Sequence, residues 1–396
     1  MALATDPFRY SYAPGTIRFG RGCVERMNAD FAEDGYDRAL VVTGTNVGAN
    51  DAVMGPITTG LGDRLQAVFA ETTPEKSFHT AYDVHDAVDT HDIDVLVGVG
   101  AGSSLDIATV ASALYARYRP MDEVRSEVDR TGHVVVEEDP GEFLPLVFVP
   151  TTLTGADLSS GAGIKVPGRT GERGVIHPEL TPSACYYDPD LFETTPENVL
   201  IGSAMNSFDK GVEALYSENR EPITDATAIR GLQYFKEGLS ALYGDDGDEA
   251  MEKVVLGGIL AQLGVTVPDG MKLAVVHAMC HALRHQFGVQ QGVAHGIVVP
   301  HALRWVMSES PGSVDRLAEA FSVSNADDRQ EAIVDEVTAV RDSLGLPGRL
   351  RDVEGTAEGE LRAAAEVAYE DSLITRGPAD LDPTVDAIES VFRAAW

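Results

Sequence analysis

Cysteines and long apolar runs are both scarce in this sequence of 396 residues. Cys23, Cys185 and Cys280 are odd in number, far apart and in no Cys-x-x-Cys motif, which argues against a disulfide framework or a zinc ribbon. No run of about 18 consecutive apolar residues appears. The opening residues, MALATDPFRYSYAPG, lack the basic and apolar regions of a secretory signal. We therefore expect a cytoplasmic protein that has no membrane partner.

Positive charge is also scarce. The chain has 63 acidic against 30 basic residues, a net charge of −33, and only six of the basic residues are lysine. Such a chain repels phosphate backbones and anionic lipids, so nucleic acid is not an expected partner. The acidic residues are dispersed, which is typical of a solvated surface and not of a disordered tail. This composition resembles that of halophilic cytoplasmic proteins, and we expect structure to be lost at low salt.

The first half of the chain alternates strand-like and helix-like segments. Short, β-branched apolar runs at 38–44, 94–100 and 144–150 are typical of strands buried on both faces of a sheet. Segments such as 49–65 and 103–118 lie beside or between these runs and have helical character. This alternation predicts a parallel α/β sheet of the dinucleotide-binding kind.

The second half has helical periodicity and almost no strand signal. The expected helical segments are 196–218, 222–243, 248–265, 271–287, 293–308, 311–323, 327–344, 357–371 and 381–395. We therefore predict a Rossmann-like α/β domain at 1–192, followed by an all-α helical domain at 193–396.

A glycine-rich turn, VGVGAGSSLD, follows the apolar run at 94–100. It contains Gly100, Ala101, Gly102 and Ser103, and the next helix carries Asp106. Glycines let the backbone approach a pyrophosphate, and a helix N-terminus offers unpaired N–H groups to it. A tight turn without a ligand would also favour glycine, so the motif alone leaves cofactor binding open.

A second loop, PTTLTGAD, follows the run at 144–150. It places Thr151, Thr152 and Thr154 after a strand, at the edge of a parallel sheet where ligands bind. Hydroxyl groups and small residues suit ribose and phosphate oxygens. A polar surface loop is the alternative interpretation.

Three histidines in HAMCHALRHQF are spaced by four residues. On a helix, His277, His281 and His285 would project from about the same face, which raises the possibility of a metal site. For His285, a partly exposed helix histidine is the simpler interpretation.

Together these motifs resemble the iron-containing (group III) alcohol dehydrogenase superfamily. Five motifs occur in that family's order: YAPGTIRFGRG, GAGSSLD, PTTLTGAD, YYDPDL and HAMCHALRHQFGVQQGVAHGIVVPH. The resemblance implies a dinucleotide-binding domain and a helical domain of the dehydroquinate synthase-like fold. It also implies hydride transfer between NAD or NADP and a small carbonyl or alcohol, by a homodimer.

The resemblance further identifies the positions where metal-dependent relatives bind their cation. With AMNSFDKGVEALYS registered on the family pattern, these positions hold Asn206, Lys210, His277 and Gln291. Amide oxygens are poor ligands for borderline divalent ions, and an ammonium group has no lone pair. The resemblance therefore implies a site without a metal.

The chain is most similar in motif to the metal-independent maleylacetate reductase branch. That branch usually has histidine where Lys210 and Gln291 stand and lacks an acid at Asp106, so the substrate does not follow from the resemblance. NAD-preferring relatives often have an aspartate at the end of an early strand. Here Gly44 is followed by Thr45, so we expect NADP to be accepted as well as NAD.

Hydride transfer to a carbonyl builds negative charge on oxygen, which must be stabilised and protonated. We expect Lys210 to stabilise this oxygen, Asn206 to act as a neutral donor, and His277 or His281 to relay the proton. Gln291 is expected to line the same site.

Three alternatives remain open from the sequence. Lys210 could merely pair with a neighbouring acid such as Asp209 or Glu213. A metal-dependent dehydrogenase could have moved its ligands to these two acids and to histidines within 277–285. The chain could also be a non-catalytic dinucleotide-binding protein.

Overall fold

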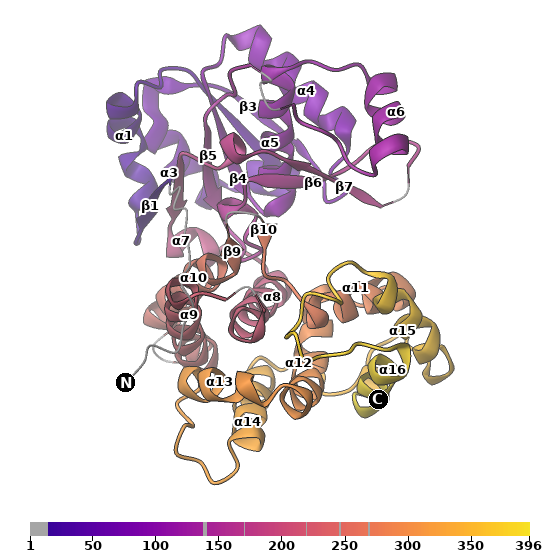
Figure 1. Ribbon diagram of the computed structural model, residues 1–396. Coiled ribbons are helices and arrows are strands. Elements are labelled where there is room, and N and C mark those ends of the chain that lie inside the picture. Colours follow the sequence, from indigo (N-terminus) through magenta and orange to yellow (C-terminus); the bar gives the residue numbers. More distant parts are fainter. Residues whose placement is uncertain (1–14, 138–140, 170, 219, 245–246, 268–269) are drawn as a thin grey trace. The chain divides into compact units, whose positions relative to one another are not determined.

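The computed structural model describes residues 15–137, 141–169, 171–218, 220–244, 247–267 and 270–396. These residues form two compact units, one ending at residue 196 and the other beginning at 197, where the sequence predicted a boundary at 192 (Figure 1). The first residues of the YAPGTIRFGRG motif, 12–14, lie outside the described residues. No helix in the described ranges combines the length and hydropathy needed to span a membrane.

The α/β unit is built on a six-stranded sheet with the order β1-β8-β5-β4-β2-β3, in which all neighbouring strands are parallel. A separate antiparallel hairpin is formed by β6 and β7. The strands are β1 (Thr16–Phe19), β2 (Ala39–Gly44), β3 (Leu65–Thr72), β4 (Val95–Gly100), β5 (Leu146–Pro150), β6 (Gly161–Lys165), β7 (Glu172–Ile176) and β8 (Ala184–Tyr187). The strands predicted from the three apolar runs are therefore confirmed as β2, β4 and β5.

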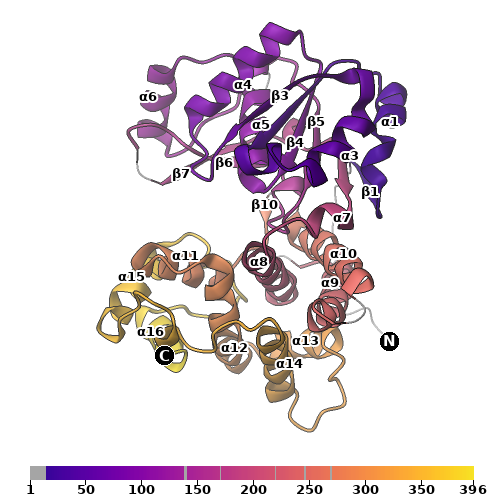
Figure 2. The ribbon, with the colours of Figure 1, turned by 180° about the vertical axis from the view of Figure 1, so that it is seen from behind.

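Helices cover both faces of this sheet, which explains why its inner strands are apolar throughout (Figure 1, Figure 2). On one face, α1 and α3 pack on strand residues such as Val41, Val97 and Val147. On the other face, α5 lies so close that a Cβ on Gly98 would be 3.0 Å from the Leu105 side chain. The helices are α1 (Met27–Asp34), α2 (Thr45–Gly48), α3 (Asp51–Leu61), α4 (Phe78–His91), α5 (Gly102–Ala116), α6 (Met121–Thr131) and α7 (Pro189–Phe192).

The second unit is helical over most of its described residues, as predicted. Its helices are α8 (Glu197–Tyr216), α9 (Pro222–Ala241), α10 (Gly247–Val265), α11 (Val275–Phe287), α12 (Gln291–Glu309), α13 (Val314–Ala320), α14 (Arg329–Ser343), α15 (Leu361–Glu370) and α16 (Val385–Ala394). The sequence did not predict the short hairpin of β9 (Thr266–Val267) and β10 (Gly270–Met271). Because this hairpin precedes α11, that helix begins at Val275, later than the predicted 271.

Helix α8 packs against α9, α10 and α12 (Figure 2). From Leu200 to its last residue, every residue except Asn206 is buried. The buried residues include Asp209, Lys210 and Glu213, which is unusual because charged groups inside a protein require partners. These partners come from the helices around α8 and form the site described below.

Candidate functional site

In the α/β unit, the ends of β4 and β5 bring most of the predicted cofactor residues together. Gly100 has φ +113°, which favours glycine, and its carbonyl accepts a hydrogen bond of 3.0 Å from the Thr151 N–H. A Cβ on Gly102 would lie 2.9 Å from Thr154 Oγ1, so this glycine lets the two loops approach. Ala101 precedes α5, and Gly102 and Ser103 begin it. The first N–H groups of a helix have no partner within it and are suited to bind an anion.

The ends of β2 and β3 join the same edge of the sheet. A Cβ on Gly44 would lie 3.2 Å from the carbonyl oxygen of Thr72, the last residue of β3. The Thr72 hydroxyl is in turn 2.7 Å from the Ser104 hydroxyl of α5. Thr152 is buried, and its hydroxyl has no hydrogen-bond partner among the residues that the structure describes. Because ligands of parallel α/β sheets bind at the carboxyl ends of the strands, this edge is the candidate dinucleotide site.

Asp106 is bound to a residue that the sequence analysis did not identify. Lys76 Nζ lies 3.0 Å from Asp106 Oδ2 and 2.6 Å from Glu172 Oε2. The backbone of Lys76 is left-handed, with φ +49°, which is strained for a residue other than glycine. Burial raises the pKa of Asp106 to about 6, against the opposing effect of Lys76. Asp106 is therefore part of a buried ion pair beside the cofactor loops.

In the helical unit, α8, α11 and α12 bring a group of polar side chains together. His277 of α11 has Nε2 2.9 Å from Asn206 Oδ1 and Nδ1 2.8 Å from Glu213 Oε2. Asp209 Oδ2 lies 3.0 Å from Nδ1 of His277 and also 3.0 Å from Nδ1 of His295 on α12. The side chains of Asp209, Glu213 and His295 are completely buried. We call these five residues the acid–histidine cluster.

Glu213 fixes the geometry of the cluster. Its Oε1 accepts hydrogen bonds from the N–H groups of Val276 and His277, and its Oε2 accepts one from Ala274, at 2.8, 3.1 and 2.7 Å. The Tyr216 hydroxyl donates to Oε1 at 3.1 Å. These N–H groups belong to the start of α11, where a carboxylate satisfies unpaired donors and is favoured by the helix dipole. Both oxygens of Glu213 are therefore engaged, and they orient the His277 ring.

Burial and charge move the pKa values in the cluster in different directions. Burial lowers the pKa of His277, but Glu213 and Asp209 raise it to about 9, so this imidazole is protonated at neutral pH. Burial also lowers the pKa of His295, and here Asp209 does not compensate. Burial raises the pKa of Asp209, but His295 and His277 lower it below the ordinary value. The cluster thus has one charged and one neutral imidazole around an ionised carboxylate.

The contacts of Asp209 are short but do not have hydrogen-bond geometry. Among the described residues, neither oxygen of Asp209 and neither ring nitrogen of His295 has a hydrogen-bond partner. Unpaired buried polar atoms are rare in folded proteins. Ligand atoms of Asp209, His277 and His295 all lie within 4.8 Å of one another. One carboxylate and two imidazoles are donors that borderline divalent metals prefer. These residues therefore fit a metal ion only when the His277 ring gives up one of the protons that it shares with Glu213 and Asn206.

The other residues that were predicted to be catalytic lie outside these contacts. Lys210 is buried, and its ammonium donates to Gln262 Oε1 of α10 at 2.7 Å. His281 Nδ1 lies 2.9 Å from Asp371 Oδ2, with 42% of the His281 side chain exposed. Gln291 is the first residue of α12.

The three histidines that are spaced by four residues do not form one site. His277 is buried in the cluster and His281 is half-exposed, while His285 is exposed, as the sequence predicted. The histidine that joins His277 is instead His295, from the next helix.

The prediction of a site without metal finds no support in the acid–histidine cluster. Of the alternative ligands, Asp209 and His277 do lie together, but the oxygens of Glu213 are occupied by backbone N–H groups. The sequence analysis missed His295. A signal was available, because His295 follows Gln291 by one helical turn within QQGVAHGIVV.

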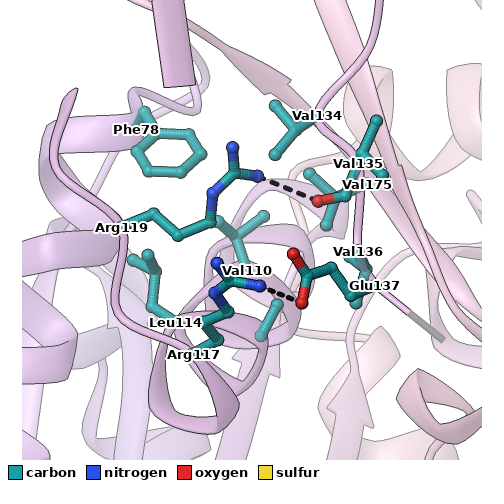
Figure 3. Close-up of a pocket in the computed structure, with 11 residues that line it drawn as sticks. Phe78, Val110, Leu114, Arg117, Arg119, Val134, Val135, Val136, Glu137 and Val175 are labelled. Atoms are coloured by element: carbon teal, nitrogen blue, oxygen red, sulfur yellow. Dashed lines mark hydrogen bonds and ion pairs between the residues drawn. The ribbon is translucent and has the colours of Figure 1, made fainter. Parts of the chain in front are cut away.

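A separate cavity in the α/β unit shares no lining residue with the cofactor loops or the cluster. Its apolar lining includes Phe78, Val110 and Val175 (Figure 3). At its rim, Arg117 pairs with Glu137, and Arg119 donates to a backbone carbonyl oxygen (Figure 3). Both guanidinium groups have partners, so the cavity is not a candidate catalytic site.

Comparison with known proteins agrees with this architecture. Residues 14–189 match the iron-containing alcohol dehydrogenase family, and residues 200–396 match the C-terminal domain of the Fe-containing alcohol dehydrogenase family. The chain therefore belongs to the iron-containing alcohol dehydrogenase family, as the sequence motifs indicated, and is an oxidoreductase.

Individual relatives differ in their substrates. The chain is 25% identical to maleylacetate reductase 1 of Rhodococcus opacus, over 100% of this chain and 98% of that protein. It is also 25% identical to an NAD-dependent methanol dehydrogenase of Bacillus methanolicus, over 93% of this chain and 95% of that protein. Its fold is similar to that of a sulfoacetaldehyde reductase from Bifidobacterium kashiwanohense in complex with NAD⁺. The two structures superpose with a TM-score of 0.85 at 19% sequence identity. The matched region covers 98% of this chain and 99% of the reductase chain.

Proposed function

We propose that this protein transfers a hydride between a nicotinamide dinucleotide and a small carbonyl or alcohol substrate. The observation that carries the proposal is the family match across both units. Two features of the structure support it. One is a glycine turn at the start of α5, and the other is a buried acid–histidine cluster in the helical unit.

The cofactor would bind through backbone groups and small side chains. The N–H groups of Gly102 and Ser103 at the start of α5 would receive the pyrophosphate, and the Thr151–Thr154 loop would contact it from the next strand. At the end of β2, Gly44 is followed by Thr45 and not by an acidic residue. Because no negative charge at this point repels a 2′-phosphate, we propose that NADP is accepted as well as NAD.

The helical unit would supply the proton and the charge for the reacting oxygen. His277 holds a proton on each ring nitrogen, because Glu213 and Asn206 both accept from it. Asp209 and Glu213 keep this imidazole charged and fixed, so it can donate to a developing alkoxide. A divalent cation, when bound, polarises a carbonyl oxygen and stabilises the charge that develops on it.

Lys210 is a second candidate for stabilising the oxyanion, as the sequence suggested. Its ammonium is already held by Gln262 inside the helical unit, so it would have to leave or share that contact. His277 would likewise have to share the contact of its Nε2 with Asn206, but Glu213 and Asp209 keep its imidazole charged, and we therefore give His277 the leading role.

The test is a dinucleotide oxidation assay on protein that has been purified in high salt. NADH and NADPH oxidation would be followed with maleylacetate and with short aldehydes, and the reverse reaction with methanol and short diols. We expect turnover with at least one carbonyl. His277→Gln should lower kcat about 100-fold or more and keep NADH binding, because general acid catalysis contributes about that much. If neither dinucleotide binds, or if His277→Gln turns over like the wild type, the proposal is wrong.

A further inference from the structure

We propose that Lys76 allows the start of α5 to bind an anionic dinucleotide, because its ammonium neutralises the buried carboxylate of Asp106. The inference rests on the proposed function for the ligand that binds there. The interaction itself rests on the geometry of three segments of the α/β unit, which are the loop between β3 and α4, the helix α5 and the β6–β7 hairpin. Lys76 is thus a positioning residue that acts on the dinucleotide through Asp106.

The first argument is the position of Asp106 on α5. It follows Gly102 by four residues, so its side chain leaves the same face of the helix about 6 Å farther along the axis. The N–H groups beside Gly102 are those that would receive the pyrophosphate. Asp106 is only 8% exposed, so water and salt screen its charge little. An ionised carboxylate at this position therefore repels a pyrophosphate unless a cation neutralises it.

The second argument is that Lys76 supplies this cation. Its Nζ lies 3.0 Å from Asp106 Oδ2 and 2.6 Å from Glu172 Oε2, and 16% of the Lys76 side chain is exposed. Burial lowers the pKa of Lys76, but Asp106 and Glu172 raise it above the ordinary value, so the ammonium stays charged. Cations are scarce in this chain, which has 30 of them against 63 acidic residues. One of the few is therefore placed on a buried acid beside the cofactor loops.

The third argument is that the surrounding backbone holds the ammonium in place. Lys76 has φ +49°, a left-handed conformation that is strained for a residue other than glycine. Its carbonyl oxygen accepts a hydrogen bond of 2.8 Å from the Lys165 N–H of β6. A Cβ on Gly163 would lie 2.6 Å from Glu172 Oε2 and 3.4 Å from Lys76 Nζ, so this glycine leaves the space that the ion pairs occupy. The hairpin thus fixes both ends of Lys76 over α5.

The charge balance shows what the ammonium does for an anionic ligand. Two carboxylates and one ammonium carry a net charge of −1 when all three are ionised. Without Lys76 the same place would carry −2, and only protonation of Asp106 would relieve it. Burial already raises the pKa of Asp106 to about 6, while Lys76 lowers it and Glu172 raises it. Loss of Lys76 would therefore raise the pKa of Asp106 further and make NADH affinity depend on pH.

The experiment is a fluorescence titration of the full-length protein with NADH, in the lowest salt at which circular dichroism shows the wild type folded. At about pH 9, Lys76→Gln should bind NADH roughly tenfold more weakly than the wild type, because one uncompensated charge then faces the pyrophosphate. At about pH 5.5 the difference should fall below about twofold, because Asp106 is then protonated in the variant. Glutamine keeps the backbone contact to Lys165, so the substitution tests the charge.

The double variant Lys76→Gln/Asp106→Asn separates charge from structure. It restores the local charge of −1, which Glu172 then carries alone, and should recover most of the NADH affinity that Lys76→Gln loses at high pH. A role of Lys76 that was only structural would not be rescued by a second substitution. The expected loss in Lys76→Gln should also shrink as salt is added, since salt screens the repulsion.

The matched control is Lys165→Gln, which removes an exposed lysine from β6 of the same hairpin. It should bind NADH like the wild type. Equal affinities of the wild type and folded Lys76→Gln at high pH overturn the inference. A loss that is the same at both pH values, or that persists in the double variant, overturns it too.

A further variant keeps the buried acid paired and acts in the opposite direction. Glu172→Gln, at a side chain that is 38% exposed, leaves Lys76 to Asp106 alone. NADH binding should then tighten about two- to threefold at high pH, because the local charge is less negative. Weaker binding by this variant would contradict neutralisation, even if Lys76→Gln does not fold.

The result also separates this inference from the proposed function. If the wild type binds NADH and reduces a carbonyl while Lys76→Gln binds NADH equally well at every pH, the function stands and the inference is wrong. If the NADH affinities are as expected but no carbonyl is reduced, the inference stands and the function is wrong.

Discussion

The candidate sites of the two units consist of different chemical groups. The α/β unit uses backbone N–H groups, glycines and hydroxyls at one edge of a sheet. The helical unit uses charged side chains that are completely buried between three helices. A backbone site of the first kind costs little stability, because its polar groups face a ligand or solvent. A buried charge cluster is stable only as a complete set, since removing one partner leaves another charge unpaired. Substitutions in the two units should therefore have unequal effects.

The largest effect is expected at Glu213. Glu213→Ala removes the acceptor for three backbone N–H groups and for His277. We expect the free energy of unfolding to fall by about 3–5 kcal/mol, the usual cost of breaking a buried ion pair, as measured by urea denaturation followed by circular dichroism. The control is Asp371→Asn, which breaks the half-exposed pair with His281 and should cost about 1 kcal/mol or less. Equal losses in the two variants would contradict the contrast between buried and exposed pairs.

In the α/β unit, the buried Asp106 should give a pH-dependent effect. Its pKa in the folded protein is about 6, above the ordinary 3.8, so folding favours the protonated carboxyl. Its contribution to stability is therefore complete below pH 3.8 and is lost as the pH rises through about 6. Relative to Asp106→Asn, the wild type should lose up to about 3 kcal/mol over this interval. Denaturation at several pH values measures this, with the exposed Asp63→Asn as control. Parallel pH profiles for wild type and Asp106→Asn would show that Asp106 does not titrate in this interval.

A smaller effect is expected at the cofactor turn. The Cβ of Gly102→Ala would lie 2.9 Å from Thr154 Oγ1 and would push the two loops apart. We expect about tenfold weaker NADH binding, or about 1.4 kcal/mol, by fluorescence titration. Gly55→Ala is the control, because a Cβ there, on α3, meets nothing within 4 Å. If both alanines leave NADH affinity unchanged, the α5 turn does not contact the cofactor.

The smallest effect is expected at His285, which is exposed on α11. His285→Ala should change the free energy of unfolding by less than about 0.5 kcal/mol and leave NADH turnover unchanged. Urea denaturation and the dinucleotide oxidation assay measure the two quantities. A loss of turnover would mean that the histidines spaced by four residues do act together.

Much of the fold could be predicted because it depends on local patterns. The runs that became β2, β4 and β5 are apolar on both faces, and the helices after residue 196 have their own periodicity. The strands β1, β3 and β8 were not predicted. Of these, β3 has alternating exposure and lies at the edge of the sheet, so its sequence has no continuous apolar run.

The cofactor turn could be predicted for a similar reason. Gly100 and Gly102 are required by backbone conformation and close approach, and both features are visible as glycines in one short segment. The acid–histidine cluster could not be predicted in the same way. Asp209 and His295 are 86 positions apart in the sequence (209 to 295), and only the packing of α8 against α12 brings them together.

The sequence by itself determined the family, the order of the secondary structure and the glycine turn, because these follow from periodicity and from conformations that few residues adopt. The tertiary structure decided which polar residues share a site. In the folded chain Lys210 donates to Gln262, and Lys76 pairs with Asp106. The ring of His295 lies 4.6 Å from that of His277 between centroids, nearer than His281 at 6.3 Å. The physical reason is that a buried charge selects its partner by distance and desolvation, and both quantities exist only once the helices have packed.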